Sequence, residues 1–235
     1  MRQDIEMLEY IKQSHANFNK NRKEYSIHGR DIVFIKDELP SHVNLTNVLN
    51  VVQKMLPPWA TKEVDIMYIG HFEIFDEKNF NSVFENGAIY ISNEQDDDND
   101  MIDDIVHEVS HAIEVPYGYK IYDDGKLETE FLQKRMKLFQ LLKAQDYKIS
   151  DARNLFLNVE FNQAFDDFLY KEVGYELLGN LLIGVFVRPY AATSINEYFA
   201  TGFVEYYMGD RVYLSETCPK LYRTISNLEE IENEL

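Results

Sequence analysis

The stretch D-D-I-V-H-E-V-S-H-A-I, residues 103–113, constrains the chain more than any other because it contains H-E-x-x-H. Residues four apart on an α-helix lie above one another on the same face, so His107 and His111 can both direct an imidazole at one zinc ion. Glu108 is turned about 100° from His107, so its carboxylate can reach a metal-bound water without binding the metal. The alternative is a helix that carries two histidines on its solvent-exposed face.

The residues around this motif favour a helix. Aspartates at 100, 103 and 104 stand at its start, where acidic side chains suit the helix dipole. Pro116 and Gly118 predict its end. An apolar stripe accompanies the histidines and predicts a buried opposite face, formed by Ile102, Ile105, Val106, Val109, Ala112 and Ile113.

Length and charge limit the classes of protein to consider. A chain of 235 residues with 45% apolar residues fits one domain over 1–235, with an α/β lobe at about 1–115 and a helical lobe at about 116–235. Its net charge of -18 repels phosphates and anionic lipids, so we expect neither nucleic acid nor membrane as a partner. A peptide or protein partner is compatible with this charge. The sequence does not indicate an oligomeric state.

The sequence also bears on the compartment. Cys218 is the single cysteine, so no internal disulfide can form. The first ten residues are polar and charged, with no signal-peptide pattern, and no run of 18 apolar residues occurs. We expect a cytoplasmic protein by default. Secretion of a chain that has lost its leader stays open.

The order of elements predicts an α+β fold. An amphipathic helix is expected at 2–20, followed by strands at 25–35 (with Gly29 in a turn), 64–69 and 87–92. Ser41 or Asn44 caps a helix that Pro57 and Pro58 end. Residues 76–86 suggest a short helix or loop. Together these elements predict a small mixed sheet of about three to four strands in the N-terminal half.

The second half is expected to be mostly helical. The apolar spacing predicts helices at 126–145 and 150–171, a buried helix at 173–186, a helix at 195–208 capped by Ser194, and a last one after Pro219.

Two stretches before the H-E-x-x-H helix invite functional interpretations. The strand Ala88-Ile89-Tyr90 would, as an edge strand, offer unpaired backbone groups to an extended peptide, and an internal strand is the alternative. The acidic residues of 94–104 predict a solvated loop. Calcium is the other interpretation, although the spacing is not that of an EF-hand.

A catalytic zinc takes three protein ligands and keeps one open position. No histidine follows His111, so a carboxylate from a later helix must complete the set. Glu197 is the best candidate, because its helix is apolar and a buried carboxylate there needs a partner. The small Ala200 and Gly202 would allow another helix to approach. The other acids considered are Glu128, Glu130, Glu160, Glu172, Glu176 and Glu205.

Further residues could support the centre. Glu205, two turns after Glu197, is the runner-up ligand or a hydrogen-bond partner for a histidine N–H. Tyr190, seven residues before Glu197, could donate its hydroxyl to an oxyanion.

Three blocks of this sequence resemble the catalytic domain of anthrax lethal factor and the clostridial Pro-Pro endopeptidases. They are His107-Glu108-x-x-His111, Tyr190 and Asn196-Glu197-Tyr198-Phe199-Ala200. The resemblance implies a zincin-like fold and a gluzincin-type zinc endopeptidase. Zn2+ would be held by His107, His111 and Glu197, with Glu108 as general base and Tyr190 as oxyanion donor. Thr201 stands where that family usually has a second acid near the metal ligands.

The expected activity is therefore zinc-dependent hydrolysis of peptide bonds. Two alternatives remain at the level of the sequence. One is a binding or structural protein that keeps the fold without turnover, and the other is a regulatory peptidase with a single protein partner.

Overall fold

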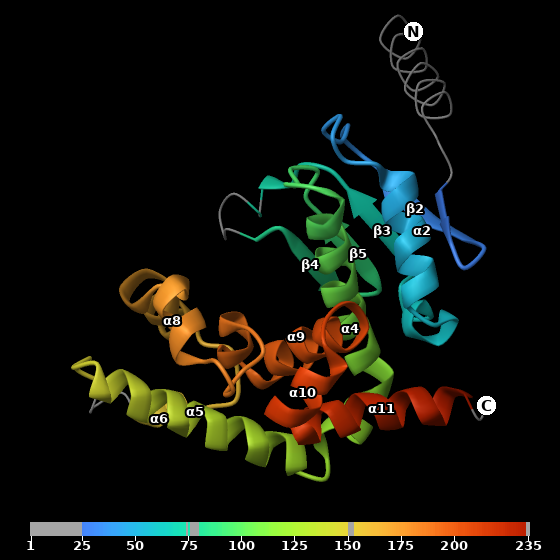
Figure 1. Cartoon of the computed structure of the whole chain (residues 1–235). Helices are drawn as coiled ribbons and strands as arrows, with labels where there is room; N and C mark the ends of the chain where they lie inside the picture. The colour runs from blue at the N-terminus through green and yellow to red at the C-terminus, as the bar shows by residue number, and fades with distance from the viewer. Residues whose placement is uncertain (1–24, 74, 76–79, 150–152, 234–235) are drawn as a thin grey trace, which may run out of the picture.

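The computed structural model describes residues 25–73, 75, 80–149 and 153–233. The helix expected at 2–20 lies outside these residues. In the described part, strands occupy the N-terminal half and helices fill the C-terminal half (Figure 1), so the α+β prediction is confirmed.

The sheet has five strands, in the order β1-β2-β3-β5-β4. The central strands β2, β3 and β5 run parallel, and β1 and β4 pair antiparallel at the two edges. The sheet is therefore mixed, as expected, but larger than the predicted three to four strands. The strands are β1 (Tyr25–Ile27), β2 (Arg30–Ile35), β3 (Ile66–Ile69), β4 (Ser82–Glu85) and β5 (Ala88–Ile91).

The strand β4 corrects the expectation of a helix or loop over 76–86 for its described part, 80–86, while 76–79 lie outside the described residues. It forms a hairpin with β5 through Asn86 and Gly87, whose φ angles are 51° and 82°. A two-residue turn with both φ angles positive matches the twist of paired strands, and Asn-Gly is its preferred sequence. The Asn-Gly pair was therefore the signal that could have predicted this hairpin.

The hairpin also decides the position of the strand Ala88-Ile89-Tyr90. This strand, within β5, pairs with β3 on one side and with β4 on the other. The edge-strand interpretation of Ala88, Ile89 and Tyr90 is therefore wrong, because both of its hydrogen-bonding sides are occupied. The edge of the sheet on this side is β4.

The H-E-x-x-H helix, α4 (Asp98–Tyr122), connects the two halves of the fold. It contacts β4 and β5, α2 (Leu45–Met55) and α9 (Ile195–Met208). Asp97 caps α4 by accepting from the backbone N–H groups of Asn99 and Asp100. The predicted stop at Pro116 and Gly118 is wrong.

Tertiary contacts stabilise the part of α4 that follows Pro116. Ile121 is fully buried in the core. Tyr117 packs edge-on against Trp59, and the hydroxyl of Tyr122 donates to Glu114, about two turns earlier in the helix. These contacts offset the hydrogen bond that Pro116 removes from the helix.

Several predicted helices are confirmed. The cap at Asn44 of α2 and the cap at Ser194 of α9 form as expected. Gly202 of α9 faces Leu221 so closely that a Cβ there would overlap its side chain, which confirms the role of a small residue. The confirmed helices of the C-terminal half are α5 (Lys126–Ala144), α9 and α11 (Pro219–Asn233).

The long helices predicted for 150–171 and 173–186 are wrong. Asn162 begins a new helix by accepting from Phe165 N–H, and the carbonyl of Val159 accepts from Ile195 N–H of α9. Gly184 has a φ of 69°, and the preceding Ile183 is 71% exposed. Short elements therefore replace them: α6 (Arg153–Phe156), α7 (Gln163–Asp167), the π-helix η3 (Phe168–Val173) and α8 (Tyr175–Leu181). The remaining short elements are η1 (Pro58–Thr61), η4 (Pro189–Ala192) and α10 (Arg211–Thr217).

The buried apolar side chains of both halves form one cluster that extends from Ile27 to Leu228. None of the described helices combines the length and the apolar character that a membrane span requires.

Candidate metal centre

Three side chains from two helices converge at the crossing of α4 and α9. The Nε2 atoms of His107 and His111 lie 3.3 Å apart. Glu197 Oε2 lies 3.0 Å from His107 Nε2, and its Oε1 lies 3.7 Å from His111 Nε2. Each residue thus offers one ligand atom to a common point, and together they could hold a metal ion.

The carboxylate of Glu197 is placed for a ligand rather than for a hydrogen bond. Despite the short distance to His107, Oε2 is buried and has no hydrogen-bond donor among the described residues. Burial opposes the ionisation of Glu197, but His107 and His111 outweigh it and hold the pKa of this carboxyl below its usual value. An ionised, buried oxygen without a donor fits a bound cation.

A second carboxylate, Glu114, orients His111. Its Oε2 lies 2.7 Å from His111 Nδ1, and its Oε1 accepts from Asn196 Nδ2 at 2.8 Å and from the hydroxyl of Tyr122. A carboxylate at Nδ1 fixes the tautomer that leaves Nε2 free to bind a metal. Glu114 was not among the site residues predicted from the sequence, although its spacing of three residues from His111 on one helix face could have indicated it.

The charges around the histidines favour a cation at this point. Burial lowers the pKa of His111, but the hydrogen bond that His111 donates to Glu114 and the charges of Glu197, Glu108 and Glu114 raise it to about 9. The three chelating side chains are 15–20% exposed, so the centre is recessed but reachable from solvent.

Glu108 lies beside this group and faces the sheet. It is 4% exposed, and its Oε1 accepts from Ser82 Oγ at 2.7 Å. Ser82 belongs to the edge strand β4. The hydrogen bond therefore ties the middle residue of the motif to the edge of the sheet.

Tyr190 lies beside His107. The centroids of the two rings are 6.3 Å apart. Burial and the nearby carboxylates, above all Glu197, raise the pKa of Tyr190 well above its usual value. Its hydroxyl therefore stays protonated and can donate at neutral pH.

The loop that carries Tyr190 is held from two sides. Arg188 forms a two-bonded ion pair with Asp103 of α4, at 2.8 and 2.7 Å. The buried Arg135 of α5 donates to the carbonyls of Ala192 and Thr193, at 2.6 and 3.1 Å. Tyr190 is thereby fixed relative to α4.

The remaining candidates lie away from the chelating atoms. Thr201 Oγ1 donates to the backbone carbonyl of Glu197 at 2.8 Å, one turn earlier in α9. The carboxylate of Glu205 accepts from Asp210 N–H at 2.9 Å, at the end of that helix. Neither residue forms a hydrogen bond with His107 or His111 in the described part of the chain, and Glu114 supports His111 instead.

The acidic residues of 94–104 form local contacts. Asp98 accepts from Asn44 N–H and Asn47 Nδ2, and Asp100 accepts from Asp96 N–H. Among the described residues, three possible metal ligands converge at His107, His111 and Glu197, and no such group lies in this segment.

The chain was also compared with known proteins. No protein-family model matches it, and neither the curated proteins nor the solved structures give a match.

Proposed function

We propose that the chain is a zinc-dependent endopeptidase of gluzincin type with a zincin-like fold, similar to the catalytic domain of lethal factor and the Pro-Pro endopeptidases. The observation that supports this most is the convergence of His107, His111 and Glu197, with Glu108 buried beside them. The sequence motif alone supplies two histidines and a glutamate. The third ligand comes from a helix far along the chain, so its arrival at the same point is independent support.

The distances agree with zinc. A tetrahedral zinc with bonds of about 2.0–2.1 Å holds two ligand nitrogens about 3.3 Å apart. The Nε2 atoms of His107 and His111 are 3.3 Å apart. Two imidazoles and one carboxylate also form the ligand set of known zinc peptidases, whereas calcium and magnesium prefer oxygen ligands only.

When bound, zinc would lower the pKa of a water molecule towards about 7 and polarise a peptide carbonyl. Glu108 takes the proton of the attacking water and delivers it to the leaving amine. Ser82 holds the Glu108 carboxylate at the edge of the sheet. Tyr190 donates its hydroxyl to the oxyanion that forms at the carbonyl.

The strand β4 is the natural place for the substrate backbone. It pairs with β5 on one side, and no described strand pairs with its other side. An extended peptide could add to this free edge by backbone hydrogen bonds. Because Ser82 of β4 touches Glu108, such a peptide would pass beside the general base.

The test combines metal analysis with a digest of mixed peptides. The purified chain is expected to bind one zinc ion through its three ligands, to cleave peptides, and to lose this activity with a chelator. Glu108→Gln should keep the zinc and lower kcat/KM by about 10²–10⁴-fold, because the proton acceptor is lost. Glu128→Gln, an exposed glutamate on α5, serves as the control.

The outcomes separate the rival interpretations. Equal activity of Glu108→Gln and the unchanged chain would refute the assigned role. Zinc without cleavage of any peptide would favour a binding protein, and cleavage of one protein partner alone would favour a regulatory peptidase. Iron instead of zinc would point to oxygenase chemistry, which also uses two histidines and a carboxylate.

A further inference from the structure

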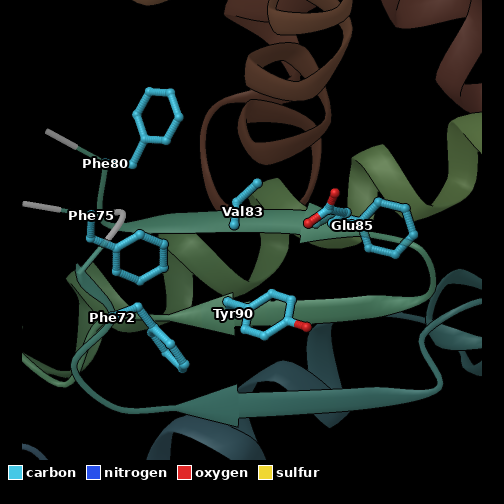
Figure 2. Close-up of a pocket in the computed structure, with 7 residues that line it drawn as sticks. Phe72, Phe75, Phe80, Val83, Glu85 and Tyr90 are labelled. Atoms are coloured by element: carbon cyan, nitrogen blue, oxygen red, sulfur yellow. The ribbon is translucent and has the colours of Figure 1, made fainter. Parts of the chain in front are cut away.

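An apolar cavity opens on the face of the sheet that points away from α4. Its volume is 410 Å³, within the range of about 300–1,000 Å³ that is typical of ligand pockets. Figure 2 shows its side chains in front of the strands, with the green ribbon of α4 behind them. The lining residues are Phe72, Phe75, Phe80, Val83, Phe84, Glu85 and Tyr90.

The walls of this cavity are packed rings. The ring of Phe72 stands edge-on to Tyr90 at 5.4 Å and to Phe75 at 5.2 Å. Tyr90 is stacked on Tyr68 at 5.3 Å, on the neighbouring strand. Such edge-on and stacked pairs restrain one another, so the cavity is built before any ligand arrives.

The register of the sheet connects the cavity to the catalytic side. Val83 pairs with Tyr90, so it lies on the face of the cavity. Its neighbour Ser82 pairs with the fully buried Ile91 and contacts Glu108 on the opposite face. Successive residues of a strand point to opposite faces. A peptide strand beside β4 would therefore alternate between the cavity and the side of Glu108.

The rim of the cavity carries one charge. Glu85 is the only ionisable acid or base among the lining residues other than the Tyr90 phenol, and it is exposed at the end opposite Phe72, Phe75 and Phe80 (Figure 2). It lies two residues from Val83, on the same face. A basic side chain two positions from the apolar one would thus meet Glu85. The net charge of -18 also favours a basic peptide.

We propose that this cavity is a subsite for a peptide that adds to β4. It takes a large apolar side chain, aromatic or long aliphatic, beside Val83, and Glu85 takes a lysine or arginine two positions away. The peptide class is therefore apolar-x-basic, or its reverse if the strand runs in the other direction. This inference rests on the proposed function, because the same peptide passes the metal centre.

The first experiment uses the zinc-loaded full chain and a pair of ten-residue peptides selected from a randomised library. The peptides differ only in phenylalanine or alanine at the preferred position, with lysine two positions away. We expect the phenylalanine peptide to have at least a tenfold higher kcat/KM. Equal values for the two peptides would overturn the proposal.

A variant then localises the preference. Val83→Trp should fill the cavity and reduce the ratio between the two peptides at least tenfold, because the phenylalanine side chain loses its place. Val83→Ile, which keeps the wall apolar and leaves most of the cavity open, should leave the ratio within twofold. An equal loss with both peptides would contradict the subsite. The peptide pair on the unchanged chain decides the matter even if Val83→Trp does not fold.

Binding without turnover separates this proposal from the proposed function. Fluorescein-labelled versions of the two peptides are titrated with Glu108→Gln and followed by anisotropy. If no peptide is ever cleaved but the phenylalanine peptide binds at least tenfold more tightly, the subsite stands and the peptidase assignment falls. Equal affinities overturn the subsite. Concentration-dependent dimerisation that Val83→Trp abolishes, without competition from peptide, would assign the cavity to a second copy and overturn it too.

Discussion

Two clusters of buried charged side chains lie near each other in this chain, and their charges are compensated by different neighbours. At the candidate metal centre, two imidazoles and the Glu197 carboxylate converge, and Oε2 of this carboxylate has no donor among the described residues. In the second cluster the guanidinium of Arg135, 1% exposed, donates to the carbonyls of Leu155, Ala192 and Thr193.

The second cluster bonds both terminal nitrogens of Arg135 to carbonyls and leaves only its Nε, which is buried, without a hydrogen-bond partner within the residues that the structure describes. The rings of Phe131, Phe156 and Phe165 lie 4.0–5.9 Å from the guanidinium carbon of Arg135. No acidic side chain in the described part of the chain forms an ion pair with it. Carbonyl oxygens and aromatic faces compensate its charge. The comparison teaches that burial of a charge alone does not indicate a binding site, whereas convergence of several ligand atoms on one point does.

The largest expected effect is on the metal centre itself. Glu197→Gln should weaken zinc binding by more than about 100-fold. Each of the three ligands contributes a large part of the zinc-binding free energy, which is about 10–16 kcal/mol at structural zinc sites. Zinc affinity is measured by competition with a chromogenic chelator. Glu205→Gln, on the same helix, is the control and should bind zinc as the unchanged chain does. Weak binding by the control alone would make Glu205 the ligand.

Arg135→Met should destabilise the chain by about 3 kcal/mol, since three buried carbonyls lose their donor. Urea unfolding measures the change, and Lys137→Met on the exposed side of α5 is the control. Zinc affinity should fall much less than in Glu197→Gln. If Arg135→Met lost zinc as completely while remaining as stable as the control, the distinction between the two clusters would be wrong.

Glu114→Gln tests the support of His111. The amide keeps the shape of the side chain but loses the charge that holds the Nδ1 proton, so zinc affinity should fall about 10–100-fold. The chelator competition measures this change, with Glu128→Gln as the matched control. An unchanged affinity would show that Asn196 and Tyr122 hold the helices without help from this carboxylate.

The smallest effect concerns Asp104, which is buried beside the metal centre but outside it. Burial raises its pKa to about 7, against the hydrogen bond from Gln95. The native state thus binds more protons than the unfolded state between pH about 4 and 7, and stability falls as the pH rises through this range.

Asp104→Asn removes the free-energy cost of ionising a carboxyl group in this buried place. The chelator-treated variant should be more stable than the unchanged chain above pH 7, and this gain should disappear towards pH 4. Unfolding curves at both pH values measure the difference, and Asp123→Asn, which is exposed, should show none. A constant gain at both pH values would mean that the carboxyl does not titrate in this range.

The sequence predicted the parts of the fold that depend on local signals. The caps at Asn44 and Ser194 formed where a polar side chain could accept the first N–H groups of a helix. The Asn86-Gly87 turn is an equally local signal. Because it was not recognised in the sequence, the edge strand β4 was not predicted. The stop at Pro116 was wrong because packing of Tyr117, Ile121 and Tyr122 outweighed a local preference.

The sequence by itself determined the chemistry at one helix face, since four-residue spacing on an α-helix brings His107 and His111 together regardless of the rest of the chain. It also selected Glu197, because a carboxylate on an apolar helix needs a partner. Only the tertiary structure decided that Glu197 meets the histidines, that Glu114 supports them, and that β4 rather than β5 is the edge. These outcomes depend on how distant segments pack, and neither residue spacing nor local propensity encodes that.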